Sequence, residues 1–244
     1  KVRLGLVPEV RFGSPPVAPE PVDPDAADDA ARRIARTAVT LLANDGTLPL
    51  TPGGRRTVVV GPAADESRIH FGAYSSVADA ELPVAIARIV TGQVEGAEAS
   101  PDVFPDLFQT RLPGIEPVFE EGARRLHPDS VTVLQAIQSL DGDVTHRPYG
   151  SFDDDGLDID GLTAAVADAD VVIAVVGERS GWVGNHTAGE GRTTANPTLP
   201  GNQNALLAAL HATGTPVVTV VVAGRPLLLQ EAHDSSAAVL LAPL

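Results

Sequence analysis

The residues best suited to chemistry gather in one glycine-rich segment, residues 175–201, which reads VVGERSGWVGNHTAGEGRTTANPTLPG. It contains two glutamates, Glu178 and Glu190, each beside glycine. A carboxyl group on such open backbone can approach a substrate oxygen and act as a general acid or base. The alternative for each glutamate is a plainly solvated loop carboxylate.

The same segment contains the only tryptophan of the chain, Trp182. An indole ring in a polar loop can support a sugar, because the C–H face of a pyranose packs on aromatic rings. The alternative is a ring that fixes the loop to the core. His186 is a candidate ligand or proton carrier, but a single histidine without partner groups defines neither role.

This segment begins at the end of a predicted buried strand, where α/β sheets bind their ligands, and it is far longer than an ordinary strand-to-helix connection. Four short runs are rich in valine or leucine and apolar on both alternating faces, which is typical of parallel strands covered on both faces. They are residues 57–60, 171–176, 217–222 and 238–242, with a weaker strand at 144–149 and a short one at 39–43. Helical patterns alternate with them at 131–139, 161–169, 202–212 and 226–233. The alternation predicts an α/β fold, a three-layer α/β/α sandwich with a mostly parallel sheet.

Residues 1–25 hold six prolines, which indicates an extended linker arriving from a missing upstream domain. A helix should follow, with Asp23 as its N-cap and Pro24 at its first position. We expect one domain over 26–244, with a long insertion at about 65–130 that folds onto the sheet. We also expect the chain to be a piece of a longer protein that is truncated after Leu244.

Composition narrows the possible functions. The formal net charge is −15, which argues against nucleic acid and anionic membrane surfaces as partners. No apolar run reaches the roughly 18 residues of a membrane span, and the absence of cysteine excludes thiol chemistry. Gly61-Pro62 after the first strong strand lacks the glycine spacing of a nucleotide site. We expect no cofactor and no metal, and the localisation stays open.

The order of several motifs resembles the second domain of family 3 glycoside hydrolases, which include β-glucosidases and β-xylosidases. These motifs are TAVTLLANDGTLPL, TVVVGPAAD, VTVLQAI, ADVVIAVVGE, TAGEGRTTANPTLPGNQNALLAAL and GTPVVTVVVAGRP. The resemblance covers about residues 26–244. Residues 72–75 also resemble a G-x-Y-S segment of one branch of the family.

The resemblance implies a retaining exo-glycosidase that acts on β-linked sugars. In the family, an N-terminal (β/α)8 barrel supplies an Asp nucleophile, and in many members the second domain supplies the acid/base Glu. Retention needs these two carboxyl groups about 5–5.5 Å apart. The implied partners are a carbohydrate substrate and the chain's own barrel domain, and the isolated chain should be inactive.

The family's G-E-G-x-D-R segment matches Gly189-Glu190-Gly191-Arg192-Thr193-Thr194, which gives Glu190 the acid/base position. Two threonines replace the family's Asp-Arg pair, and Glu178 stays a second candidate. Further candidates for substrate binding are Trp182, Arg179, Thr187 and Arg192. The alternative function is a non-catalytic carbohydrate-binding or structural module with the same fold.

Overall fold

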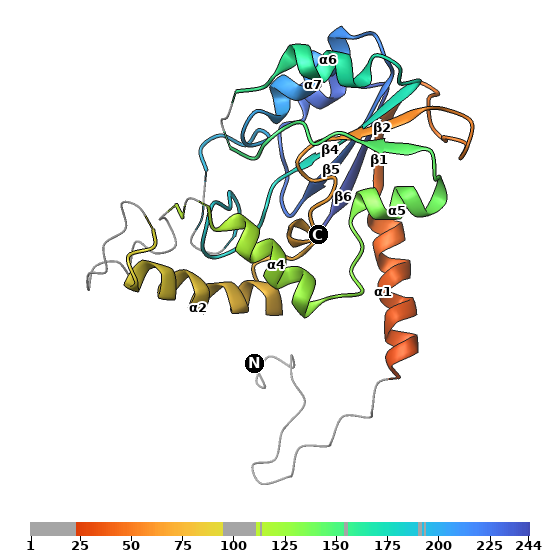
Figure 1. Ribbon diagram of the computed structural model, residues 1–244. Coiled ribbons are helices and arrows are strands. Elements are labelled where there is room, and N and C mark those ends of the chain that lie inside the picture. Colours follow the sequence, from red (N-terminus) through yellow and green to blue (C-terminus); the bar gives the residue numbers. More distant parts are fainter. Residues whose placement is uncertain (1–22, 95–110, 113, 154–155, 190–191, 193) are drawn as a thin grey trace, which may run out of the picture. The chain divides into compact units, whose positions relative to one another are not determined.

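The computed structural model describes residues 23–94, 111–112, 114–153, 156–189, 192 and 194–244 (Figure 1). The chain divides into two units, Lys1–Thr37 and Ala38–Leu244. The first unit contains nearly all of helix α1 (Pro24–Ala38). An oxygen of the Asp23 side chain accepts a hydrogen bond from the Asp25 N–H at 3.2 Å, so the helix begins where the capping pattern predicts.

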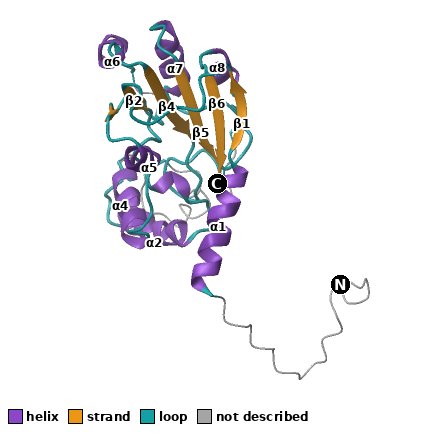
Figure 2. Cartoon of the chain, turned by 90° about the vertical axis from the view of Figure 1, so that its right-hand side faces the viewer, coloured by secondary structure: helices purple, strands orange, loops and turns teal. Residues whose placement is uncertain are grey.

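The second unit is built on a six-stranded sheet with strand order β1-β6-β5-β4-β2-β3. Strand β1 runs antiparallel to β6, and all other neighbouring pairs are parallel (Figure 2). The strands are β1 (Thr40–Asn44), β2 (Thr57–Val60), β3 (Val144–His146), β4 (Val171–Gly177), β5 (Val217–Ala223) and β6 (Ala238–Pro243).

Side chains of successive strand residues enter two different cores, one on each face of the sheet. Val58 and Val60 belong to one apolar cluster, whereas Val59 between them belongs to the other. Helices α6 (Ile159–Val166), α7 (Gln203–Ala212) and α8 (Gln230–Asp234) contribute to the first cluster. Helix α5 (Val133–Leu140) contributes to the second. The predicted α/β sandwich with a mostly parallel sheet is therefore confirmed.

Several element boundaries differ by a few residues from the sequence prediction, and two of these differences have a clear physical reason. Strand β3 stops at His146 rather than at residue 149, because Pro148 has no N–H for the sheet. The helix predicted over 226–233 begins only at Gln230, and the preceding Leu227 and Leu229 pack against the core instead.

The insertion forms its own small core. It contains the 3₁₀ turn η2 (Arg68–His70), helix α2 (Ser76–Val90) and helix α4 (Glu116–Leu126). The sequence predicts an insertion folded onto the sheet. Ile69 of η2 belongs to the second sheet cluster, whereas α2 and α4 share an apolar cluster that includes no strand residue among those described. Val183 belongs to this cluster and Trp182 packs against it, so the insertion is joined to the glycine-rich segment.

No helix among the described residues is long and apolar enough to span a membrane.

Candidate active site

The parallel strands β2, β4 and β5 end at one edge of the sheet, and the glycine-rich segment leaves β4 there. It folds back on itself soon afterwards. Ser180 and Ala188 form an isolated parallel bridge, and the Gly181 N–H donates to the Ala188 carbonyl at 3.0 Å. The Arg192 N–H then donates to the Gly189 carbonyl at 3.1 Å. We call residues 178–192 the site loop.

Glu178 is fully buried at the first position of the site loop. Its two oxygens accept hydrogen bonds from Nε and Nη2 of Arg225 at 2.7 and 2.8 Å. The Thr187 hydroxyl donates to the same carboxylate at 2.8 Å. Protein donors therefore occupy both oxygens, and the ion pair joins the ends of strands β4 and β5.

Glu190 lies outside the described residues, but the backbone on either side of it is tightly held. A Cβ at Gly189 would lie 2.1 Å from the Gly181 carbonyl oxygen, so only glycine allows this approach. On the other side, Arg192 donates from Nε to the Trp182 carbonyl at 3.0 Å and from Nη1 to the His186 carbonyl at 2.9 Å. Burial lowers the pKa of Arg192 to about 10, and it remains a cation at neutral pH.

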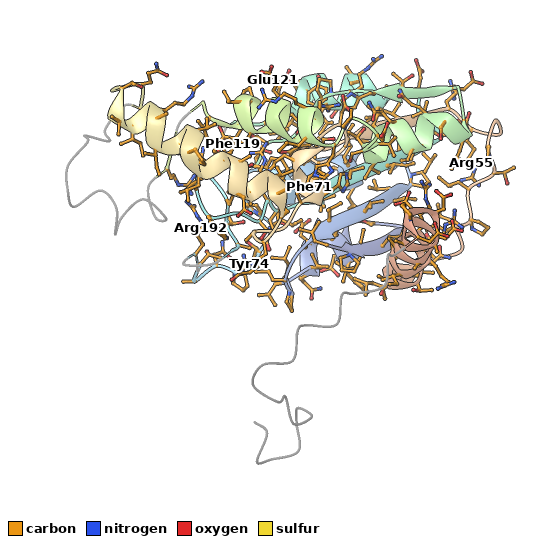
Figure 3. The ribbon with its side chains drawn as sticks, turned by 90° about the horizontal axis from the view of Figure 1, so that it is seen from below. Arg55, Phe71, Tyr74, Phe119, Glu121 and Arg192 are labelled. Atoms are coloured by element: carbon orange, nitrogen blue, oxygen red, sulfur yellow. The ribbon has the colours of Figure 1, made fainter. Side chains whose placement is uncertain are left out.

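Trp182 and Tyr74 place two aromatic rings beside this loop. Their ring centroids are 6.1 Å apart, with the planes at 77°. Trp182 is half-buried against the insertion core, whereas Tyr74 is 79% exposed. The geometry makes Trp182 a contact between the loop and the insertion, and it makes Tyr74 the ring that a ligand can reach. Figure 3 shows Tyr74 and Arg192 on the same side of the molecule.

A cavity of about 770 Å³ lies beside Tyr74 and Arg192. Its lining includes His70, Tyr74, Thr187, Gly189, Arg192 and Arg225. Thr187 and Arg225 also line a neighbouring pocket of about 420 Å³, together with Asn185, Asn196 and Asn204. Hydroxyls, amides and guanidinium groups around an aromatic ring suit a ligand rich in hydroxyl groups.

Arg179 lies apart from the Glu178 pair. Its Nε donates to the buried Glu66 carboxylate, and its guanidinium carbon lies 4.3 Å from the centroid of the Phe152 ring. Burial raises the pKa of Glu66 to about 7, although the charge of Arg179 acts to lower it. His186 is also buried, and burial lowers the pKa of its imidazole to about 4. No group of three or more possible metal ligands occurs among the described residues.

The sequence model of the glycosyl hydrolase family 3 C-terminal domain matches residues 39–244. The chain belongs to this family. This confirms the resemblance inferred from the motif order.

Relatives of this family 3 domain include a periplasmic β-glucosidase from Salmonella typhimurium, which is 30% identical over 98% of this chain and 28% of its own length. A β-xylosidase from Formosa agariphila is 33% identical over 43% of this chain and 14% of its own. The chain therefore spans little more than a quarter of the length of the first relative and a smaller share of the second.

Solved structures support the fold of the family 3 domain. A β-glucosidase from Listeria innocua in complex with glucose superposes with a TM-score of 0.59 at 22% identity, covering 90% of this chain and 23% of that chain. A family 3 exo-β-xylosidase in complex with a xylobiose aziridine probe gives a TM-score of 0.52 at 20% identity, covering 89% and 22%.

The structure of the family 3 domain brings together Glu178, Thr187 and Arg192 around the site loop, while Arg179 binds Glu66 instead. Sequence reasoning missed Arg225, the partner of Glu178. Its one signal is its place directly after a buried strand, in the AGRP motif, which puts it at the ligand edge of a parallel sheet.

Glu66 and His186 should make the stability of the family 3 domain depend on pH in opposite directions. The pKa of Glu66 rises from 4.5 to about 7 on folding, so its contribution is complete below pH 4.5 and falls as the pH rises to 7. The pKa of His186 falls from 6.5 to about 4, so its contribution is complete above pH 6.5 and is lost as the pH falls to 4. Each effect amounts to about 3 kcal/mol, at 1.36 kcal/mol for each unit of pKa.

The two effects nearly cancel between pH 4.5 and 6.5 in the unsubstituted chain. In Glu66→Gln the free energy of unfolding should rise with pH over this window, and in His186→Gln it should fall. Urea unfolding at half-unit intervals of pH measures both curves. The other titrating groups are common to all three proteins, so three parallel curves would contradict the assignment.

Proposed function

We propose that this chain is the second domain of a retaining exo-β-glycosidase that hydrolyses β-linked glucosides or xylosides. It contributes the general acid/base, Glu190, and the aglycone-side subsite. The observation that carries the proposal concerns the described residues that flank Glu190 in the sequence. Gly189 packs against Gly181, Arg192 donates from Nε to the Trp182 carbonyl, and both residues line the 770 Å³ cavity. The names of the relatives, a β-glucosidase and a β-xylosidase, support the substrate class.

Glu190 is a better acid/base than Glu178. A catalytic acid must present a protonated oxygen to the glycosidic oxygen, and it must later accept a proton from water. Both oxygens of Glu178 already accept hydrogen bonds from Arg225 and Thr187. Glu178 therefore holds the sheet edge together, and Arg225 and Thr187 shape the cavity wall.

In the proposed reaction, a nucleophilic Asp of the companion barrel attacks the anomeric carbon. Glu190 donates its proton to the departing oxygen, and the glycosyl group is left on the Asp. Glu190 then takes a proton from water as that water attacks the intermediate. Tyr74 supports the leaving sugar or aglycone, and Arg192 holds the loop. The isolated chain has no nucleophile for this reaction and should not turn over glycosides.

The experiment uses the gene product that carries this chain together with its barrel domain. Glu190→Gly should lower kcat/KM for an aryl β-glycoside with a poor leaving group by about 10²–10⁴-fold, the range of general acid catalysis. Azide should restore turnover of a substrate with a good leaving group and give a β-glycosyl azide. Glu121→Ala on the exposed face of α4 is the control and should leave activity unchanged.

Near-normal activity of Glu190→Gly would contradict the proposal and move the acid/base role to Glu178 or to the barrel. An unsubstituted protein that binds a β-linked sugar but does not hydrolyse it would support the alternative, a non-catalytic carbohydrate-binding or structural module.

A further inference from the structure

Arg68 and Glu81 form an ion pair inside the insertion. Arg68 belongs to η2 and Glu81 to α2, and their side chains are only 1% and 4% exposed. The guanidinium meets both carboxylate oxygens, with Nη2 3.0 Å from Oε2, and its Nη1 donates to the Phe71 carbonyl at 2.5 Å. Desolvating two charges is costly, and apolar residues of similar volume are often at least as stable. Stability of the fold alone therefore gives little reason for this pair.

The pair also contacts the site loop, more than a hundred residues further along the chain. Nη2 of Arg68 donates to the Ser180 carbonyl at 2.8 Å. Ser180 is paired with Ala188, two residues before Glu190. Nε2 of His186, on the returning arm of the loop, lies 3.6 Å from Oε2 of Glu81. Both arms of the loop that carries Glu190 therefore meet one buried ion pair.

The Gly181 backbone packs closely against the side chains of His186 and Arg68. A Cβ at Gly181 would lie 2.3 Å from Cδ2 of His186 and 2.8 Å from Nη2 of Arg68. The loop backbone, the imidazole and the guanidinium thus fill one space without room for a methyl group. A densely packed contact of this kind transmits small displacements rather than absorbing them.

Helix α4 of the insertion binds the backbone of Arg68. The Glu120 carboxylate of α4 accepts hydrogen bonds from the N–H groups of Ser67 and Arg68 at 2.9 and 2.8 Å. Arg68 is therefore held through its backbone by α4 and through its side chain by α2. The insertion therefore holds Arg68 from two sides, and the guanidinium of Arg68 reaches the site loop.

We propose that the Arg68–Glu81 pair is a positioning device for the site loop: by holding the Ser180 carbonyl it fixes the loop that carries the proposed acid/base. This inference rests on the proposed function, because it assigns the pair to the Glu190 carboxyl group. Neither Arg68 nor Glu81 touches substrate.

The test compares substrates that differ only in leaving group. A misplaced acid lowers kcat/KM most for a poor leaving group, because such a group needs protonation to depart. In the gene product with its barrel, we would measure kcat/KM for a phenyl and a 2,4-dinitrophenyl β-glycoside. The double variant Arg68→Met/Glu81→Met removes both charges and so leaves no unpaired ion in the core. Its ratio of kcat/KM, dinitrophenyl over phenyl, should rise at least about tenfold, since a displacement near 1 Å can cost about 10²-fold.

The ratio does not depend on the fraction of folded protein, so it separates positioning from loss of stability. Arg68→Lys keeps the charge next to Glu81 but loses the fork that reaches Ser180, and it should shift the ratio in the same direction by a smaller factor. Arg56→Met/Asp170→Asn breaks an ion pair at the opposite edge of the sheet and should leave the ratio unchanged.

An unchanged ratio in both Arg68 variants, with kcat/KM lowered equally for the two substrates or not at all, would overturn the proposal. Failure of the proposed function has a different signature, because Glu190→Gly would then itself show no dependence on the leaving group.

Discussion

Replacement of Arg225 by methionine should lower the free energy of unfolding by about 3 kcal/mol, because it leaves the buried Glu178 carboxylate without its cationic partner. Glu178 is fully buried, and among the described residues Arg225 supplies two of the three hydrogen bonds that its carboxylate accepts. Without the guanidinium, the Thr187 hydroxyl would be its one remaining donor in the described part of the chain. Breaking a buried pair on one side costs about 3–5 kcal/mol. We expect the lower end because a quarter of the Arg225 side chain is exposed.

The matched control is the double variant Arg225→Met/Glu178→Gln, which removes the charge together with its partner. It should recover much of the lost stability, because an amide can still accept the Thr187 hydroxyl without being an unpaired ion. Urea unfolding of the single and double variants, followed by circular dichroism, provides the comparison. Equal losses in the two variants would mean that packing, rather than the unpaired carboxylate, accounts for the cost.

Gly61→Ala should have a still larger effect and prevent stable folding. Gly61 follows strand β2 with φ at +102°, and a Cβ there would lie 2.1 Å from the Val175 carbonyl oxygen. Val175 belongs to the central strand β4, so the clash cannot be relieved without moving the sheet. Left-handed strain alone costs about 1–2 kcal/mol. With the displaced strand, we expect a total above about 4 kcal/mol, a value reached only by severe substitutions.

Gly214→Ala is the control for the strain term, because Gly214 has φ at +76° and a Cβ added there would have no other atom within 4 Å. It should lose only about 1–2 kcal/mol. Soluble yield and thermal unfolding of both variants measure the difference. If Gly61→Ala melts within a few degrees of Gly214→Ala, the close approach to Val175 is not what selects glycine after β2.

The local sequence pattern was sufficient to predict the parallel sheet and the family. Runs such as 171–176 are apolar at every position, and only a strand covered on both faces buries them fully, so their place in a parallel sheet follows from the sequence. The order of short motifs likewise led to family 3, which the match over 39–244 confirms. The antiparallel direction of β1 could not be predicted from the sequence, because a five-residue strand has the same residue pattern in either direction.

The roles of the polar residues depend on partners far away in the chain. Glu178 has the neighbours expected of a catalytic loop glutamate, yet Arg225 lies 47 residues later and occupies its carboxylate. Arg68 reaches Ser180 across 112 residues, and Trp182 packs against a core made largely by the insertion. Periodicity and motif spacing describe neighbours along the chain, whereas burial and hydrogen bonding depend on segments that meet only when the sheet has formed. The tertiary structure therefore decides that Glu178 is bound to Arg225 at the end of the sheet. It also decides that the buried Arg68 contacts the site loop through the Ser180 carbonyl.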